Sequence, residues 1–393
     1  MTNEGPISRR AARRARARRR RRNTAVGLAV VVVAAVATGW AVLGRGGSPA
    51  GAAAAPRASG TTAPDGAAPS ATAPGATPAA HEPAGTVTLA FAGDVHFTDR
   101  TANRLGVDPA LGPMARALGA ADFSMVNLET AITTRGTPQP KKYHFRTTPA
   151  ALGALQRSGV DAVTMANNHA VDYGPQGLAD SLAAQRGSPI PVVGIGPDEA
   201  AAYRPYVTTV NGVRLAVVAA SQVQDYTNQA FRAGPGRPGI ASALDRPALL
   251  AAVRDARRQA DVVVVYLHWG TEGQSCPGPE QKSIAADLSQ AGATAVVGTH
   301  AHVMLGSGML GPTYVAYGFG NFLWYGSSPY PHSDQTGVTT LTVTGGKVAK
   351  AVFSPALVDG QGVPEPQTGA AGRTITDRYE GLRGCTGLTA PPA

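Results

Sequence analysis

Between residue 86 and about residue 358, short apolar runs alternate with segments that have a helical pattern. This alternation limits the fold more than any other feature of the sequence. Residues 86–92 alternate β-forming side chains and end at Gly93-Asp94, as a strand does when it enters a tight loop. Several helical segments carry a proline in the first turn, where the missing N–H costs no hydrogen bond. The alternation predicts a buried, largely parallel sheet covered by helices.

The pattern also predicts where the folded domain begins and ends, at residues 86–360. Further strands are predicted at residues 123–126, 162–165, 191–195, 215–220, 262–267, 294–297, 313–317, 338–343 and 348–353. Helices are predicted at residues 109–118, 149–158, 175–185, 246–259 and 279–291. The last strands are joined by turns such as Gly345-Gly346, which is typical of a hairpin. An α/β core that finishes in antiparallel strands predicts a second sheet packed on the first.

The positive charge of the chain is concentrated in residues 1–23. The formal charge is +10, but ten arginines lie between Arg9 and Arg22 and Glu4 is the only acidic residue of that segment. The remaining residues are close to neutral, with 25 basic and 24 acidic side chains. The charge of the whole protein therefore gives no reason to expect a nucleic-acid partner.

Residues 24–43 contain no charged side chain and consist mainly of Ala, Val, Leu and Gly. A helix of this length spans about 30 Å, the thickness of the hydrocarbon core of a bilayer. The arginines before it orient its N-terminus toward the cytoplasm and can contact anionic lipid headgroups. We expect a single-pass membrane anchor with the following domain outside the cell. A cleaved signal peptide is the alternative, and it also exports the domain.

The composition of two further segments predicts how ordered they are. Residues 44–85 are rich in Ala, Pro, Gly and Thr and predict a disordered linker, because they hold too few large apolar side chains to form a core. Residues 361–393 predict a C-terminal tail that is ordered mainly if a cysteine bridge holds it. Cys276 and Cys385 are the only cysteines, so an exported chain predicts one disulfide between them, with two free thiols as the alternative.

Candidate ligands follow five of the predicted strands. They are Asp94 and His96, then Asn127 and Glu129, then Asn167, Asn168 and His169, then His268, and finally His300 and His302. Because ligand sites in open α/β sheets lie at the carboxyl ends of strands, we expect these side chains to meet. Carboxylate, imidazole and amide groups together suit Mn, Zn, Fe or a similar divalent ion. The set therefore predicts a metal site, and two ions would need a carboxylate shared between them.

Each of these residues also has a simpler reading when it is taken alone. Asp94 after Gly93 is typical of a turn, Asn167-Asn168 of a turn or helix cap, and His268 of a half-buried histidine. His300-Ala301-His302 is more specific, since alternate residues of an extended segment point the same way. The order of all five groups carries the prediction.

The motifs in this order resemble those of the CapA (PgsA) family. They are Gly93-Asp94-Val95-His96, Asn127-Leu128-Glu129, Asn167-Asn168-His169, His268, Gly298-Thr299-His300-Ala301-His302 and Gly318-Phe319-Gly320-Asn321-Phe322. The resemblance covers about residues 87–358. It implies a role in capsule or poly-γ-glutamate synthesis and membership of the calcineurin-like metallophosphoesterase superfamily. The implied fold is a four-layer α/β/β/α sandwich.

The resemblance also implies a role for each motif residue. Asp94, His96 and His302 would hold one divalent ion, and Asn168, His268 and His300 the other. Glu129 would bridge the two ions, where the wider superfamily has an aspartate. His169 would bind no metal and would act near the leaving group as an acid or electrostatic stabiliser. Many members have an apolar residue where this chain has His96.

Other residues near the motifs allow two readings each. Lys141, Lys142, His144 and Arg146 are a basic cluster that either grips an anionic substrate or forms a solvated loop. Asp172 and Tyr173 either orient His169 or begin the next helix. Asn321 and Trp324 either line the site or belong to a turn and the core. Lys142, His144 and Asn321 are our candidates for substrate binding.

Two functions from different classes fit the resemblance. The first is a membrane-anchored, metal-dependent hydrolase or transferase that builds, releases or remodels an extracellular polymer. Its partner would be the anionic polymer or a precursor. The second is a non-catalytic scaffold for membrane synthase or export subunits. The presence of both His96 and His169 favours the enzyme, because a scaffold does not need them.

Overall fold

The computed structural model describes residues 85–326 and 330–392. The arginine-rich arm, the predicted membrane helix at residues 24–43 and the predicted linker at residues 44–85 lie outside the described residues, apart from Gly85. Among the described helices, none is long and apolar enough to span a membrane. The compact unit that contains all described residues is Glu82–Ala393.

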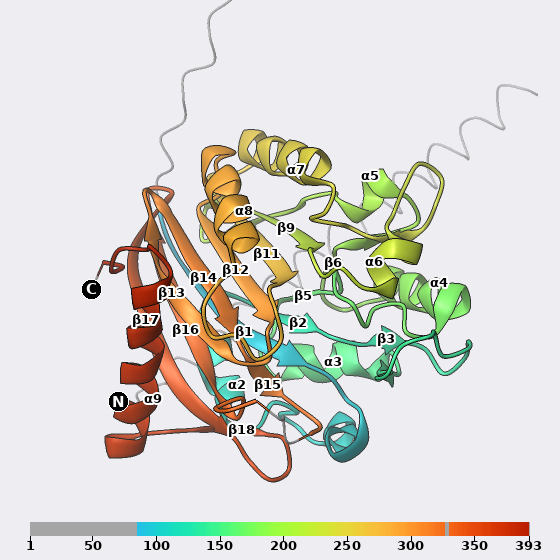
Figure 1. Cartoon of the computed structure of the whole chain (residues 1–393), viewed down its shortest axis with the longest axis horizontal. Helices are drawn as coiled ribbons and strands as arrows, with labels where there is room; N and C mark the ends of the chain where they lie inside the picture. Colours follow the sequence, from blue (N-terminus) through green and yellow to red (C-terminus); the bar gives the residue numbers. More distant parts are fainter. Residues whose placement is uncertain (1–84, 327–329, 393) are drawn as a thin grey trace, which may run out of the picture. The chain divides into compact units, whose positions relative to one another are not determined.

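Most of the described strands belong to two mixed sheets (Figure 1). The first sheet contains β18 (Pro364–Pro366), β17 (Lys347–Val358), β16 (Gln335–Thr344), β1 (Thr86–Val95), β2 (Phe123–Leu128), β5 (Ala162–Thr164) and β6 (Val192–Val193) in that order, with β15 (Asn321–Leu323) paired to β1. The second contains β13 (Met304–Leu310), β14 (Thr313–Phe319), β12 (Ala295–His300), β11 (Val262–Trp269), β9 (Val213–Ser221) and β8 (Tyr206–Val210). Small two-stranded sheets pair β3 (Ala131–Ile132) with β4 (Arg146–Thr147), and β7 (Ile195–Gly196) with β10 (Gly239–Ile240).

The described helices are short relative to the sheets. The α-helices are α2 (Ala115–Ala120), α3 (Ala150–Arg157), α4 (Gly174–Arg186), α5 (Glu199–Ala202), α6 (Tyr226–Phe231), α7 (Arg246–Gln259), α8 (Pro279–Gln290) and α9 (Gly369–Gly381). The 3-10 helices are η1 (Asp99–Gly106), η2 (Gly112–Met114) and η3 (Leu382–Cys385).

The alternation of side chains along β1 shows how the layers pack. Leu89 and Phe91 point into a core shared with Val217, Val264 and other residues of the second sheet. Ala90 and Ala92 point to the opposite face, where α2, α3 and α4 cover the first sheet. Helices α7 and α8 cover the outer face of the second sheet in the same way (Figure 1). The domain is therefore a four-layer α/β/β/α sandwich, since each sheet buries both faces.

The predicted strand and helix alternation is confirmed, with local differences. The predicted strand at residues 191–195 is divided into β6 and β7. The predicted helix at residues 109–118 starts only at Gly112, first as the 3-10 helix η2 and then as α2. The predicted C-terminal strands do not form a sheet of their own. Strands β16 and β17 extend the first sheet through β1, whereas β13 and β14 extend the second.

The C-terminal segment has more regular structure than its composition predicted. Residues 361–393 include β18 and the 13-residue helix α9, so the folded domain continues past residue 360. Ile375 and Tyr379 of α9 are buried against Met304 of β13 and are close to Phe353 of β17. The helix thus closes an edge where the two sheets meet, and its stability comes from this tertiary packing.

Candidate metal centre

The strand-end residues predicted as ligands gather at one end of the two sheets. Asp94 lies near the end of β1, and Glu129 follows β2, its parallel neighbour. His268 and His300 lie near the ends of the adjacent parallel strands β11 and β12. All four side chains are buried. Parallel pairing thus brings together residues that are distant in the sequence.

A close backbone contact fixes Asp94 in this arrangement. A Cβ atom on Gly93 would lie 1.8 Å from the carbonyl oxygen of Gly320, so only glycine fits between β1 and β15. The same approach lets the Asp94 N–H donate to the Gly320 oxygen at 3.0 Å. The Gly93-Asp94 and Gly320-Asn321 motifs are therefore two sides of one contact.

We expect Gly93→Ala to lower the free energy of unfolding by about 3 kcal/mol or more, since β1 and β15 must separate to admit the methyl group. Urea unfolding measures the change. Gly106→Ala is the matched control, because a Cβ there meets no atom within 4 Å, and we expect a change of about 0.5 kcal/mol or less. Equal stability of the two variants would contradict the contact.

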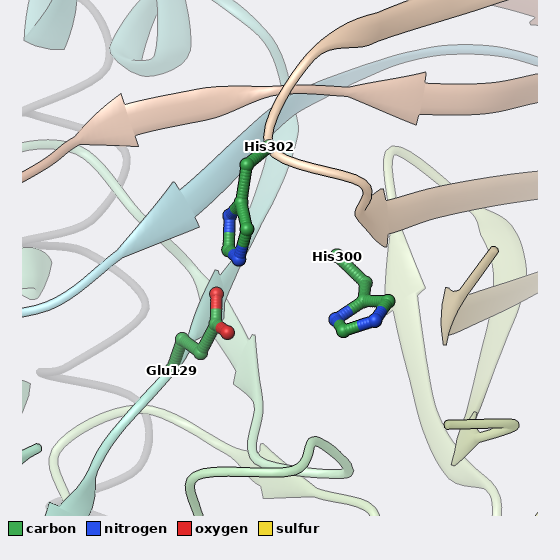
Figure 2. Close-up of side chains that lie close together, drawn as sticks. All are labelled: Glu129, His300 and His302. Atoms are coloured by element: carbon green, nitrogen blue, oxygen red, sulfur yellow. The ribbon is translucent and has the colours of Figure 1, made fainter. Parts of the chain in front are cut away.

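Glu129 belongs to two groups of potential metal ligands. One group combines Glu129 with Asp94 and His268, and the other combines it with His300 and His302. Within each group the ligand atoms lie within 4.8 Å of one another. Figure 2 shows Glu129, His300 and His302 directed toward a common space. Glu129 is thus the shared residue, as a bridging carboxylate must be.

The division of the other ligands differs from the one that the resemblance implied. His268 falls with Asp94, and His300 falls with His302. Asp94 and His302 are nevertheless neighbours, with Oδ2 and Nδ1 3.5 Å apart. Asn168 joins the first group through its Oδ1 atom, which lies 2.8 Å from His268 Nε2.

The buried polar atoms of the site fit a bound cation. Within the described part of the chain, neither carboxylate oxygen of Glu129 has a hydrogen-bond partner, and His300 Nδ1 also lacks one. His268 Nε2 and His169 Nε2 lie 3.5 and 3.8 Å from Glu129 Oε1. A buried carboxylate without hydrogen bonds is costly unless a positive charge compensates it. The donor set of carboxylates, imidazoles and an amide oxygen suits a divalent ion.

The turn that carries His300 and His302 is not the extended segment that the sequence predicted. Both residues have positive φ angles, 97° for His300 and 57° for His302, which side chains other than glycine rarely adopt. The two imidazole rings are 5.8 Å apart at their centroids. The rings therefore meet through a left-handed turn between β12 and β13, a form of backbone strain that concentrates at functional sites.

Amide and hydroxyl side chains orient the candidate ligands. Asn127 Nδ2 donates to Asp94 Oδ1 at 2.7 Å, and its Oδ1 accepts from Asn167 Nδ2 at 2.9 Å. Thr299 Oγ1 lies 3.0 Å from His268 Nδ1, and Asn321 Oδ1 lies 3.0 Å from His302 Nδ1. Such partners fix ring orientation. The Asn127 and Thr299 contacts were not predicted, although both residues belong to the motifs.

His169 contacts Asp172, which in turn contacts Lys141. Its Nδ1 atom lies 2.6 Å from Asp172 Oδ2, and Lys141 Nζ lies 2.9 Å from the other Asp172 oxygen. Burial raises the pKa of Asp172 to about 6, and the positive charge of Lys141 opposes that rise. Burial also lowers the pKa of His169, and Lys141 adds to this effect. A neutral His169 whose Nδ1–H donates to Asp172 directs the lone pair of Nε2 toward Glu129.

His96 occupies an aromatic pocket and is in neither ligand group. Its ring stacks on Phe145 at a centroid distance of 4.5 Å, and Phe145 in turn stacks on His169 at 4.1 Å. The backbone N–H groups of Thr98 and Tyr325 approach its two ring nitrogens at 3.2 Å. The metal-ligand role implied for His96 is therefore not part of the geometry described above.

The predicted substrate-binding residues lie in three different settings. Lys142 is exposed, with its ammonium 4.8 Å from the centre of the Tyr143 ring. Nε2 of the His144 ring is hydrogen-bonded to the carbonyl oxygen of Gln139 at 2.6 Å. Asn321 is buried against His302. Among the contacts described for these three, the one with a candidate ligand belongs to Asn321, and the substrate role of all three stays a prediction.

A cavity of about 430 Å³ opens beside the site, next to Trp324. The Trp324 ring lies 4.5 Å from the ring of His302, so one tryptophan contacts both regions. The Arg100 guanidinium donates to the carbonyls of Trp324, Gly326 and Gly360 and fixes this wall of the cavity.

Carboxylates and imidazoles of the site shift the pKa values of one another. Burial opposes ionisation of Asp94, but its hydrogen bond with His302 and the charge of His268 hold its pKa below the ordinary range. Burial raises the pKa of Glu129, and the charge of Asp94 raises it further. Burial opposes protonation of His302, but Glu129 and Asp94 together raise its pKa to about 9. Burial lowers the pKa of His268 to about 4.

These shifts predict how the stability of the metal-free protein depends on pH. The pKa of His302 rises from about 6.5 in the unfolded chain, so its stabilising contribution is complete below pH 6.5. We expect about 3 kcal/mol of unfolding free energy to be lost as the pH rises through 9. Urea unfolding with a chelator present measures the loss.

His302→Gln is the control for this pH dependence, because it removes the titrating group. The pKa values of His268 and His300 are lowered, so these rings are neutral in both states above pH 6.5 and do not contribute in this window. A wild-type protein that keeps its stability from pH 6.5 to 9 would rule out a protonated His302.

Three comparisons relate the chain to known proteins. The model of the family described as bacterial capsule synthesis protein PGA_cap matches residues 88–325. The PGA biosynthesis protein CapA of Bacillus subtilis is 28% identical over 244 residues, which are 61% of this chain and 63% of that protein. A probable polyglutamine synthesis accessory protein of Mycobacterium tuberculosis is 32% identical over 192 residues, covering 47% of this chain and 50% of that protein. The chain thus spans less than two thirds of the length of these curated relatives.

Solved structures that overlap with this chain have lower sequence identity than the curated relatives. A novel phosphatase of Mycoplasma pneumoniae has 16% identity and a TM-score of 0.43, over 76% of this chain and 99% of that one. A putative 5'-nucleotidase of Staphylococcus aureus has 14% identity and a TM-score of 0.42, over 76% and 58%. These overlaps are too loose to assign an activity. The family match, in contrast, spans β1 to β15 and every candidate ligand, and the chain belongs to the bacterial capsule synthesis protein PGA_cap family.

Proposed function

We propose that this protein takes part in the synthesis or remodelling of an extracellular anionic polymer of the poly-γ-glutamate type, as a metal-dependent hydrolase or transferase. Family membership and the named roles of the relatives support the polymer. The buried Glu129 carries the enzymatic part of the proposal, because it lies between the Asp94/His268 and His300/His302 groups and its two oxygens have no hydrogen bond among the described residues.

The ligands assigned to divalent ions are Asp94, Glu129, Asn168, His268, His300 and His302. Ions bound there would polarise a phosphoryl or carbonyl oxygen and lower the pKa of a bound water. Mn, Zn and Fe all suit this ligand set. The substrate class that we propose is a phosphoester, by analogy with the metallophosphoesterase superfamily, or an amide bond of the polymer.

His169 is the residue to which we assign proton transfer. With Nδ1–H donated to Asp172, its Nε2 atom is free to accept a proton on the side of Glu129. The protonated ring can then return that proton to a leaving group. Asp172 stabilises the imidazolium, and Lys141 holds Asp172 in position.

Residues 24–43 are assigned to a membrane anchor, with the arginine-rich arm in the cytoplasm and the domain outside the cell. In this arrangement the polymer, or its precursor, reaches the site from the outside. Synthase or export subunits in the membrane are the partners that we expect, and nucleic acid is not among them.

The test uses the full-length protein. Bound metal is measured by elemental analysis, and hydrolysis is assayed on phosphodiester and γ-glutamyl substrates for the wild type and His169→Ala. We expect bound Mn, Zn or Fe and turnover that depends on His169. Absence of metal after incubation with Mn and Zn would overturn the metal site. Bound metal without turnover that depends on His169 would favour the scaffold function instead.

A further inference from the structure

We propose that the loop at residues 270–278, held by the Cys276–Cys385 disulfide, positions the His300-Ala301-His302 turn of the metal site. The inference rests on the proposed metal-binding function. It assigns to the disulfide a role in positioning the site, in addition to its effect on stability.

The first step is a contact between the loop and the turn. The Gly273 N–H donates to the carbonyl oxygen of Ala301 at 2.8 Å. Ala301 is buried and lies between the two histidines with positive φ. Strand β12 ends at His300 and β13 begins at Met304, so the turn between them has no strand ladder to hold it. The Gly273 hydrogen bond supports the turn from outside.

The loop itself depends on attachments at particular points. It contains no helix or strand between Trp269 and Pro279, and Glu272 and Cys276 are exposed. Tyr330 donates its hydroxyl hydrogen to Glu272 Oε2 at 2.7 Å, and the Gly278 N–H donates to Gln281 Oε1 at 3.0 Å. The disulfide adds a covalent attachment at Cys276. A loop with little burial keeps one conformation only through such contacts.

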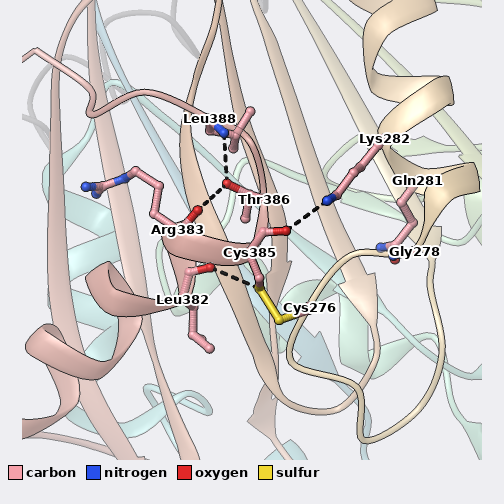
Figure 3. The surroundings of a disulfide bond; sticks show 9 residues. All are labelled: Cys276, Gly278, Gln281, Lys282, Leu382, Arg383, Cys385, Thr386 and Leu388. Atoms are coloured by element: carbon pink, nitrogen blue, oxygen red, sulfur yellow. Dashed lines mark hydrogen bonds between the residues drawn. A yellow bond between two sulfur atoms is a disulfide. The ribbon is translucent and has the colours of Figure 1, made fainter.

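The other end of the disulfide is anchored to the strand that follows the turn. Lys282 Nζ donates to the Cys385 carbonyl at 2.9 Å (Figure 3). Arg383 Nε donates to the Ser307 carbonyl of β13 at 2.7 Å. Thr389 and Met309 of β13 exchange two backbone hydrogen bonds.

These contacts form a closed ring. It runs from the histidine turn into β13, across to the C-terminal segment, through the disulfide to the loop, and back to Ala301 through Gly273. Opening the ring at the disulfide removes the covalent attachment of the loop and leaves hydrogen bonds such as Tyr330–Glu272 to hold it near the turn. The two imidazoles would then lose part of the support that holds them toward Glu129.

The test measures Co²⁺ binding to the full-length protein by titration and by the visible ligand-field spectrum. We expect the double variant Cys276→Ser/Cys385→Ser to bind Co²⁺ about 10-fold more weakly, a loss typical of residues that orient metal ligands. Its spectrum should also change, because the ligand geometry changes. Gly273→Ala keeps the disulfide but disturbs the contact, since the added Cβ would lie 2.5 Å from the Tyr330 ring. It should show the same two changes.

Leu249→Ala is the matched control, because it removes buried side-chain volume in α7, far in the sequence from the ring. It should lower stability and leave the Co²⁺ spectrum unchanged. Hydrogen exchange of the metal-free proteins provides a readout that needs no metal, and residues 300–303 should exchange faster in the cysteine variant than in Leu249→Ala.

The outcomes separate this inference from the proposed function. Wild-type protein that binds no Co²⁺ overturns the metal site, and exchange at residues 300–303 then still decides whether the loop holds the turn. Unchanged affinity, spectrum and exchange in folded Gly273→Ala and cysteine variants overturn the positioning role. Circular dichroism shows whether the cysteine variant folds. If it does not fold, the Gly273→Ala variant alone tests the positioning role of the loop.

Discussion

Replacing Glu129 with glutamine is expected to remove bound metal and to lower turnover by about 10²–10³-fold or more. The glutamine side chain has nearly the same shape but no charge, so it cannot compensate two cations between the Asp94/His268 and His300/His302 groups. Elemental analysis of the purified variant should find less than about a tenth of the wild-type metal, the consequence of losing the shared ligand.

Glu280→Gln is the matched control for this substitution. Glu280 lies on the surface in α8, where it pairs with Arg246. We expect it to keep its metal and its turnover. A Glu129→Gln protein that retains wild-type metal content would contradict the assignment of Glu129 as the shared ligand.

The second large effect is expected when His169, or Asp172 that contacts it, is replaced. His169→Ala should lower turnover by about 10²–10⁴-fold, the usual contribution of a positioned acid or base, while bound metal stays at the wild-type level. Asp172→Asn should also lower turnover, because the asparagine amide no longer fixes the tautomer in which Nδ1 carries the proton. Steady-state kinetics together with elemental analysis separate loss of proton transfer from loss of metal.

Asp225→Asn serves as the control for Asp172→Asn. Both carboxylates contact Lys141, Asp172 at 2.9 Å and Asp225 at 3.6 Å, but only Asp172 contacts His169 among the contacts described for these two residues. Equal losses in the two variants would assign the effect to Lys141 and not to His169.

The sequence was most informative where local pattern and topology agree. Asp94, Glu129 and Asn168 lie at or just past the ends of parallel strands, and this predicts that they meet, because the carboxyl ends of such strands lie at one edge. Glu129 belongs to both groups of potential ligands, and its bridging role stays a prediction. With only two cysteines in the chain, the sequence predicted a Cys276–Cys385 disulfide with two free thiols as the alternative, and the structure contains the disulfide.

Other features depended on packing between segments that no local pattern relates. The positive φ angles of His300 and His302 arise where β12 turns back into β13, and His300 lies in one ligand group with His302. His96 was predicted from motif position to bind metal, and that role stays a prediction; its stacking on Phe145 could not be read from the sequence. Helix α9 was missed because a segment rich in Gly and Thr has weak helix propensity and is stabilised only by contacts with both sheets.

The sequence by itself determined which predicted strand each candidate ligand follows, and which residue types are available to a cation. It also determined the family. These features follow from periodicity and motif order. Only the tertiary structure showed which imidazoles lie in one group with Glu129, that His169 contacts Asp172, and that Gly273 donates to Ala301. These contacts depend on side-chain packing and on single hydrogen bonds between segments that are distant in the sequence, so local sequence patterns do not predict them.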